Sequence, residues 1–284
     1  TQYLATRGIY RNLANDWLLE ALMSFYMSGE QHPMPKDSST LVVTLRHNVG
    51  VESDVALARA ELQSLCKGAS EFVEILNKRQ LLDALEMLSV VEQPLRTMTH
   101  FPRKEGVLAF MVHGAKASNL EDVVQKMAFA QDILYRTKKP YTPTNPLMHK
   151  LMRSKPIANG HLAWAISLSS VLDYSTKMVF NREKGMSVSV GLDVLLGYLL
   201  DGVEPPRAFM AEVKAAVAAK KTTLYLTHEL HLYKGKFFPR MVHSLMNRYL
   251  HGKVAFVVDP FVGSGTTLLE ASILGYPSLG IDVD

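Results

Sequence analysis

Apolar and polar residues along the chain follow two spacings, one typical of strands and the other of amphipathic helices. The predicted strands are residues 40–47, 106–114 and 161–169. The predicted helices are residues 10–29, 52–68, 119–137 and 204–221, with Gly68 closing the second and Asn119 capping the third. Residues 80–91 fit a helix or a passage from helix to strand, and residues 185–202 fit further strand and helix.

This alternation predicts an N-terminal α/β or α+β domain over residues 1–140. The segment "KKPYTPTNP", residues 138–146, predicts a linker, because each proline restrains the residue before it and lacks an amide donor. Residues 141–221 then form a connecting region of mixed strand and helix.

The last sixty or so residues carry the clearest pattern. A strand at "TTLYL" precedes a helix over residues 239–250, where Pro239 fits the first turn because that amide has no helical partner. The apolar run at residues 254–258 predicts a strand covered on both faces of a parallel sheet. "DPFVGSGTT" then turns into a helix that Gly275 can end, and "PSLGID" predicts the second strand of a βαβ unit.

The turn in this unit has the features of a site for a nucleotide-type ligand. Gly263 and Gly265 permit a close backbone approach and dihedral angles that a Cβ would forbid, and the following helix directs its free amides at the ligand. Asp282 lies 19 residues after Gly263, near the spacing at which an acid meets ribose hydroxyls. No Lys follows the second glycine as in an ATPase phosphate loop, and Leu268 replaces the third glycine of the dinucleotide fingerprint.

The sequence "DPFVGSGTTLLEA…GIDVD" resembles the S-adenosylmethionine motif of amino-methyltransferases, which methylate exocyclic amines of DNA or RNA bases. Upstream, "YKGKFFPRMVHSLMN" resembles the companion motif, in which a Phe-Pro pair begins a helix beside the methionine end of the cofactor. The resemblance covers residues 233–284, under a fifth of the chain. It implies that residues 222–284 are the start of a Rossmann-like methyltransferase domain that is incomplete at its C-terminus.

The resemblance also implies roles for individual residues. The methionine part of S-adenosylmethionine would be held by Asp259, Phe261, Gly263, Ser264 and Gly265. Polar contacts at the helix start would come from Thr266 and Thr267, and the ribose hydroxyls would bind Asp282, with Asp284 as a second candidate. Phe238 and Pro239 would close the site from the preceding segment.

The catalytic motif of this family, an Asp or Asn followed by Pro-Pro and an aromatic residue, is not recognisable here. In the family its acid or amide accepts hydrogen bonds from the target amine, and its aromatic residue stacks on the flipped base. The single Pro-Pro pair lies between Glu204 and Arg207, and Asn145 is followed by one proline only. We therefore expect the catalytic motif beyond Asp284 in a longer parent protein, of which this chain, beginning with Thr1, is a fragment.

Composition and charge indicate a partner and a compartment. Residues 207–253 contain nine Lys or Arg against two acids, which suits a polyanionic substrate such as nucleic acid. Apolar runs such as residues 194–200 fall short of the ~20 residues needed to span a bilayer, so no membrane partner is expected. One cysteine and no secretory signal pattern predict a reducing, cytoplasmic location.

Two other chemistries are disfavoured. Cys66 lacks the preceding proline of the cytosine-C5 methyltransferase nucleophile, so we interpret it as a core residue. His228, Glu229 and His231 do not follow the HExxH order of zinc proteases, so we predict local structure or a substrate-facing loop rather than a metal site.

Three functions remain open. The favoured one is methylation of adenine N6 or cytosine N4 in DNA, because those enzymes share the Phe-Pro motif. The second is methylation of guanine N2 in tRNA, by enzymes that carry an N-terminal α/β RNA-binding domain. The third is a non-catalytic nucleic-acid-binding module with a degenerate methyltransferase fold.

Overall fold

The computed structural model describes residues 39–46, 49, 51–88, 106–143, 146–169, 225–229 and 235–283, all within one of the two structural units of the chain, residues 39–284. The helices predicted at residues 10–29 and 204–221, and the mixed segment 185–202, lie outside the described residues. The described part is a mixed α/β fold built on an antiparallel sheet. No helix in it is long and apolar enough to cross a membrane.

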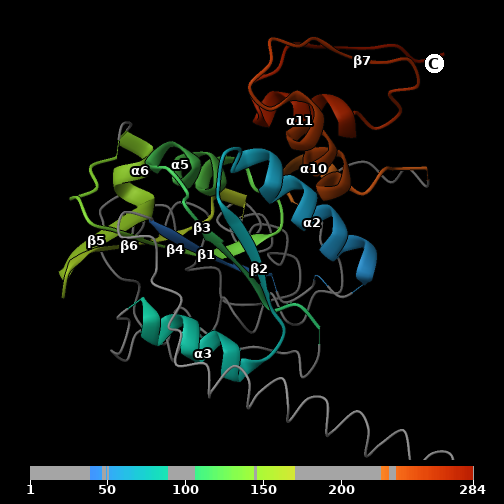
Figure 1. The fold of residues 1–284 in the computed structure, drawn as a ribbon. Coiled ribbons are helices and arrows are strands. Elements are labelled where there is room, and N and C mark those ends of the chain that lie inside the picture. Colours follow the sequence, from blue (N-terminus) through green and yellow to red (C-terminus); the bar gives the residue numbers. More distant parts are fainter. Residues whose placement is uncertain are drawn as a thin grey trace, which may run out of the picture. The chain divides into compact units, whose positions relative to one another are not determined.

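The main sheet has six strands in the order β2-β3-β1-β4-β6-β5, and each neighbouring pair is antiparallel (Figure 1). The strands are β1 (Thr40–Leu45), β2 (Glu71–Ile75), β3 (Ala109–His113), β4 (Ala130–Thr137), β5 (Met152–Ile157) and β6 (Gly160–Ile166). The helices that belong with this sheet are α2 (Glu52–Leu65), α3 (Lys78–Met87), α5 (Ala117–Lys126) and α6 (Pro146–Leu151).

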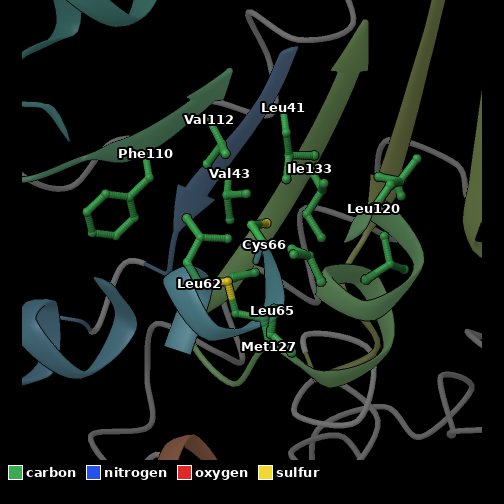
Figure 2. Packing of buried hydrophobic residues seen from close by; sticks show 14 of the residues in the cluster. Leu41, Val43, Leu62, Leu65, Cys66, Phe110, Val112, Leu120, Met127 and Ile133 are labelled. Atoms are coloured by element: carbon green, nitrogen blue, oxygen red, sulfur yellow. The ribbon is translucent and has the colours of Figure 1, made fainter. Parts of the chain in front are cut away.

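Helices cover both faces of this sheet. α2 and α5 pack on one face in the larger apolar cluster, while α3 packs on the other face in a smaller one (Figure 1). All six residues of β1 are buried, because alternate side chains of this central strand enter the two clusters. Figure 2 shows Leu41 and Val43 of β1 in the larger cluster, beside Leu62 and Cys66.

The helix predicted at residues 119–137 is wrong in its second half. α5 ends at Lys126, and residues 130–137 form β4, which pairs with β1 and β6. Ile133 and Leu134 enter opposite core clusters, so this apolar segment is buried on both faces, as a central strand requires. Asn119 is not the N-cap but the third residue of α5, where its Oδ1 accepts the Lys116 N–H at 2.8 Å.

The sheet continues past residue 140. β5 and β6 extend it from β4, so residues 152–166 of the predicted connecting region belong to the same sheet as β1. β6 confirms the strand predicted at residues 161–169. β2 and β5 were not predicted. Both are outermost strands of the described sheet; β5 is largely exposed and β2 mostly half-buried, and charged or polar residues interrupt any apolar run in each.

The predicted βαβ unit is present. β7 (Val257–Asp259) and β8 (Ser278–Gly280) pair in parallel, and α11 (Thr266–Ile273) connects them. The expectation that the first strand is covered on both faces is wrong for the described residues. Val258 is 53% exposed and its cross-strand neighbour Leu279 is 49% exposed, because α11 covers only the opposite face of this two-stranded sheet.

Two short elements precede this unit. α10 (Pro239–Leu250) confirms the predicted helix, with Pro239 in its first turn. η2 (Leu226–Glu229) is a 3-10 turn, so the strand predicted at residues 222–226 is wrong at Leu226, whose φ of 52° is incompatible with a strand. The rest of that predicted strand, apart from Tyr225, lies outside the described residues.

Cys66 is predicted to be unreactive in the folded protein at pH 8. Its side chain is 1% exposed, and burial together with the Asp122 carboxylate raises the pKa of the thiol to about 12. Because the thiolate is the nucleophile, reaction with an aromatic disulfide reagent should begin only when urea unfolds the chain. Labelling of the native protein at the rate of a free thiol would contradict this placement of α2 against the sheet.

Candidate cofactor site

The glycine turn connects β7 to α11 and lies across the end of β8. Gly263 and Gly265 have φ angles of 49° and 79°, in the left-handed region that glycine adopts without the cost of a Cβ. The Val262 amide donates to the Ile281 carbonyl at 3.0 Å, and the Ile281 amide donates to the Asp259 carbonyl at 2.9 Å. The turn and the ends of both strands therefore form one backbone network.

Two of the predicted carboxylates contact this turn. Asp259 Oδ1 accepts the Phe261 N–H at 3.1 Å, and Asp282 Oδ2 accepts the Gly263 N–H at 2.6 Å. Asp259 is buried, whereas Asp282 is exposed. The acid predicted to bind ribose thus lies beside the glycine turn, at the carboxyl ends of two parallel strands, where open parallel sheets bind ligands.

The solvent side of the turn is open. A Cβ added at Gly265 would meet no heavy atom within 4 Å, and Phe261 is 83% exposed. The first amides of α11 have no helical acceptor and point out of its N-terminus. Ser264 Oγ and Thr266 Oγ1 are 3.5 Å apart, and Thr267 is half-buried. Amide donors, a hydroxyl and a carboxylate therefore lie along the exposed side of this turn.

The residues of the Phe-Pro motif have a different environment. Phe238 packs against the larger apolar cluster of the main sheet, and Pro239 is buried at the start of α10. The structure brings the other predicted site residues together on one turn: Asp259, Phe261, Gly263, Ser264, Gly265, Thr266, Thr267 and Asp282. Asp284, Glu204, Arg207, Asn145 and His231 lie outside the described residues.

A buried carboxylate behind the turn holds α11 in place. Glu270, on α11, is fully buried and accepts three hydrogen bonds. Its Oε1 accepts from the Tyr225 hydroxyl at 2.8 Å and from His228 Nε2 at 2.7 Å, and its Oε2 accepts from His243 Nδ1 at 2.6 Å. These contacts link α11 to η2 and to α10.

The geometry fixes the proton on His243. Its Nε2 lies 2.5 Å from the Lys126 carbonyl oxygen, which can only accept, so Nε2 carries hydrogen. A second hydrogen lies between its Nδ1 and the Glu270 carboxylate, and because the pKa of His243 is raised while that of Glu270 is lowered, it resides on Nδ1 and makes the imidazole a cation. Burial alone would lower the pKa of His243, but the hydrogen bond and charge of Glu270 raise it overall.

The same pairing keeps Glu270 anionic. Burial alone would raise the pKa of its carboxyl, but hydrogen bonds from His228 and His243 and the His243 charge hold that pKa below its ordinary value. Tyr225 stays protonated and donates, because burial raises the pKa of its phenol well above the usual value. Among the described residues no group of three His, Cys, Asp or Glu side chains could hold a metal. His228 and His243 both hydrogen-bond the Glu270 carboxylate.

A second buried carboxylate connects α10 to the main sheet. Glu61 on α2 is fully buried, and its Oε1 accepts from the Ala128 N–H at 2.9 Å and from Asn247 Nδ2 at 2.6 Å. Asn247 Nδ2 also donates to the Lys126 carbonyl at 2.8 Å, and Ser64 Oγ donates to the Asn247 carbonyl at 3.0 Å. Through α10, the layer of α2 and α5 therefore positions the helix of the glycine turn.

Sequence reasoning missed this network. Glu270 was noticed only as the Glu of the family motif, and Glu61, Tyr225 and His243 carried no signal because their partners are distant in sequence. His228 is buried, which confirms local structure for this residue. Arg240, one of the nine basic residues counted in residues 207–253, is 1% exposed and donates to the Ala128 carbonyl at 2.8 Å, so its charge does not lie on the surface.

Two curated proteins are similar to this chain. The type II methyltransferase M.MjaII of Methanocaldococcus jannaschii is 29% identical over 119 residues, which cover 42% of this chain and 19% of that protein. The type II methyltransferase M.BsoBI of Geobacillus stearothermophilus is 35% identical over 81 residues, which cover 28% of this chain and 15% of that protein. The chain thus spans less than a fifth of either relative's length. No family model and no solved structure matches it. Both relatives are methyltransferases, as the motif around the glycine turn predicts.

Glu61 is predicted to make stability fall as pH rises from 5 to 8. Burial raises the pKa of its carboxyl to about 7 from an ordinary value of 4.5. In this interval the folded state keeps a proton that the unfolded state has released, so the unfolding free energy should decrease by about 2 to 3 kcal/mol through this group.

Urea unfolding of the wild type and of Glu61→Gln at several pH values measures this contribution. Gln keeps the Oε1 acceptor for Ala128 and Asn247 but does not titrate, so the two stability curves should diverge above pH 5 in favour of the variant. His243 and Glu270 titrate in both proteins, so their contributions largely cancel in the difference. Parallel curves would show that Glu61 is ionised in the fold.

Proposed function

We propose that this chain belongs to an S-adenosylmethionine-dependent N-methyltransferase that acts on an exocyclic amine of a DNA base, adenine N6 or cytosine N4. Residues 222–284 would carry the cofactor-binding part, and residues 1–140 a nucleic-acid-binding N-terminal domain. The observation that carries the proposal is the hydrogen bond between Asp282 and the Gly263 amide, which joins the predicted ribose acid to the predicted methionine turn.

The residues of the turn fit the proposed cofactor. Asp282, exposed at the end of β8, would accept the ribose hydroxyls, and the open space at Gly265 would admit the methionine part beside Ser264. The amide end of α11 would receive its carboxylate. When bound, S-adenosylmethionine supplies an electrophilic methyl group. Asp259 holds the turn by accepting the Phe261 amide and would keep these donors oriented.

DNA is favoured over tRNA because both similar proteins are type II methyltransferases, a class that acts on DNA. The target amine must leave the base stack to reach a methyl group, so an enzyme of this kind also requires surfaces that grip the phosphate backbone. The catalytic residues stay unassigned.

Gly265→Ala is predicted to weaken S-adenosylmethionine binding at least tenfold, measured by calorimetric titration. The Cβ would occupy the open space at the turn and strain a φ of 79°. Gly275→Ala is the matched control, because Gly275 has a φ of 78° and equally open surroundings at the other end of α11. Both variants should lose about 1 kcal/mol of stability, and only the first should lose affinity.

Asp282→Asn provides a second, independent test. The amide oxygen of Asn can still accept the Gly263 N–H, so this contact with the turn should remain. The Val283 N–H, which Asp282 Oδ1 accepts at 2.8 Å, loses its acceptor, and the charge facing the ribose hydroxyls is lost. Affinity for S-adenosylmethionine should fall about tenfold, by one lost charged hydrogen bond. Unchanged affinity in both Gly265→Ala and Asp282→Asn would reject the cofactor site. Cofactor binding alone does not separate an enzyme from the non-catalytic module, because this chain carries no recognisable catalytic motif.

A further inference from the structure

The buried His243 ring on α10 lies between two groups that accept hydrogen. Its Nε2 is 2.5 Å from the Lys126 carbonyl oxygen at the end of α5, and its Nδ1 is 2.6 Å from Glu270 Oε2 on α11. One imidazole therefore connects a helix of the main sheet to the helix that follows the glycine turn.

These two contacts together need a second proton. A neutral imidazole carries one N–H and one lone pair. Between the Lys126 carbonyl and an ionised Glu270, the neutral ring would turn its lone pair toward one of two oxygens, at 2.5 or 2.6 Å. Both contacts of His243 are therefore hydrogen bonds only while a proton is held between Nδ1 and Glu270 Oε2.

The other donors to Glu270 need no such proton. The Tyr225 hydroxyl donates to Oε1 and stays protonated, because burial raises the pKa of its phenol well above the ordinary value. His228 faces Oε1 with Nε2 alone, so a neutral ring can donate there. The contact with His243 is therefore the one that depends on a doubly protonated imidazole.

The charges around His243 set the pH at which this proton leaves. Glu270 on α11 and Glu61 on α2 both favour the cation, while burial opposes it. Arg240, one turn earlier on α10, stays charged throughout, and the Lys126 side chain pairs with an acid of its own helix. Overall the pKa of His243 is raised from 6.5, so the second proton is present at pH 6 and is lost as pH rises through the raised value.

The attachment of α11 to α10 depends strongly on such polar contacts. The apolar cluster between the two helices is small, with Val242, Met246 and Ala271 as its buried members. Glu270 lies in the second turn of α11, which begins at Thr266 directly after the glycine turn. A change in the hydrogen bonds of this carboxylate therefore acts on the helix start that adjoins the proposed cofactor.

We propose that His243 is a positioning residue whose second proton fixes α11 and the glycine turn, so that affinity for S-adenosylmethionine falls when that proton dissociates. This rests on the proposed function, in which the glycine turn holds S-adenosylmethionine. His243 does not touch the turn itself and acts through Glu270.

Glu270→Gln provides a form of this contact that needs no second proton. The Gln oxygen can accept from Tyr225 and His228 as Oε1 does, and its amide nitrogen can donate to Nδ1 of a neutral His243. S-adenosylmethionine is titrated calorimetrically into wild type and variant from pH 6 to 9.5. The ratio of wild-type to variant affinity should fall about tenfold, by one charged hydrogen bond. The amine of the cofactor and Asp282 titrate in both measurements and largely cancel in this ratio.

Hydrogen exchange without cofactor separates this proposal from the proposed function. Protection of α11 in the wild type, relative to the variant at the same pH, should fall over the same interval, while β1 and β4 show no difference. Cofactor binding with a constant affinity ratio, or α11 protection with a constant ratio, would overturn the role of His243 and leave the cofactor site intact. A pH-dependent α11 in a protein that binds no cofactor at any pH would support the positioning of α11 and reject the proposed function.

Two ionisable neighbours need their own controls. The comparison is repeated with Glu61→Gln in both proteins, which keeps the Oε1 acceptor, and with His228→Gln, whose amide nitrogen can donate to Oε1 in place of Nε2. The tenfold change should persist in both backgrounds. Its disappearance in either one would assign the proton to that neighbour and overturn the role of His243.

Discussion

The buried Glu270 carboxylate is the interaction on which the arrangement of the glycine turn depends. A buried charge is costly unless it is paired and hydrogen-bonded, and Glu270 meets both conditions with Tyr225, His228 and the His243 cation. Its three donors come from two elements outside its own helix. The hydrogen bonds of Glu270 on α11 are therefore complete only when η2 and α10 are in place.

The chain of contacts continues from His243 into the main sheet. His243 donates to the Lys126 carbonyl at the end of α5, and Asn247 on the same helix donates to Glu61 of α2. α10 thus has polar contacts with both neighbours, while its apolar residues Val242 and Met246 pack with Ala271 of α11. Among the described strands, the antiparallel sheet and the parallel βαβ unit share no pairing, and α10 contacts both.

This construction suits a turn that, under the proposed function, must stay open to admit a cofactor. The turn itself has little apolar packing, since Phe261 and the outer residues of β7 and β8 are exposed. The turn is held instead by backbone hydrogen bonds among Asp259, Val262 and Ile281. The hydrogen bonds of Glu270 hold α11 behind it. The first amides of α11 and the Asp282 carboxylate can then hold fixed positions without being buried.

Local sequence predicted most of the glycine turn and its flanking elements, but not the buried hydrogen bonds that hold them in place. Glycine and proline restrict or permit backbone conformations locally, whatever the rest of the fold. Pro239 at the start of α10, the glycines before α11 and Gly275 after it therefore allowed α10, α11 and β8 to be predicted correctly. β4 was mistaken for helix because a strand buried on both faces has no alternation to reveal it. Glu270 and Glu61 could not be paired with His243 and Asn247, because those partners lie 27 and 186 residues away and meet only in the fold.

Hydrogen exchange of the wild type, Glu270→Ala and Glu270→Gln at pH 7 tests the central claim most directly. Loss of the carboxylate leaves the buried His243 cation without its partner, so amides of α11 and β8 should exchange at least tenfold faster in Glu270→Ala, while those of β1 and β4 stay protected. Gln can donate to a neutral His243 and should restore most of the protection. Unchanged exchange of α11 and β8 in Glu270→Ala would contradict the account, because the turn would then be held without this carboxylate.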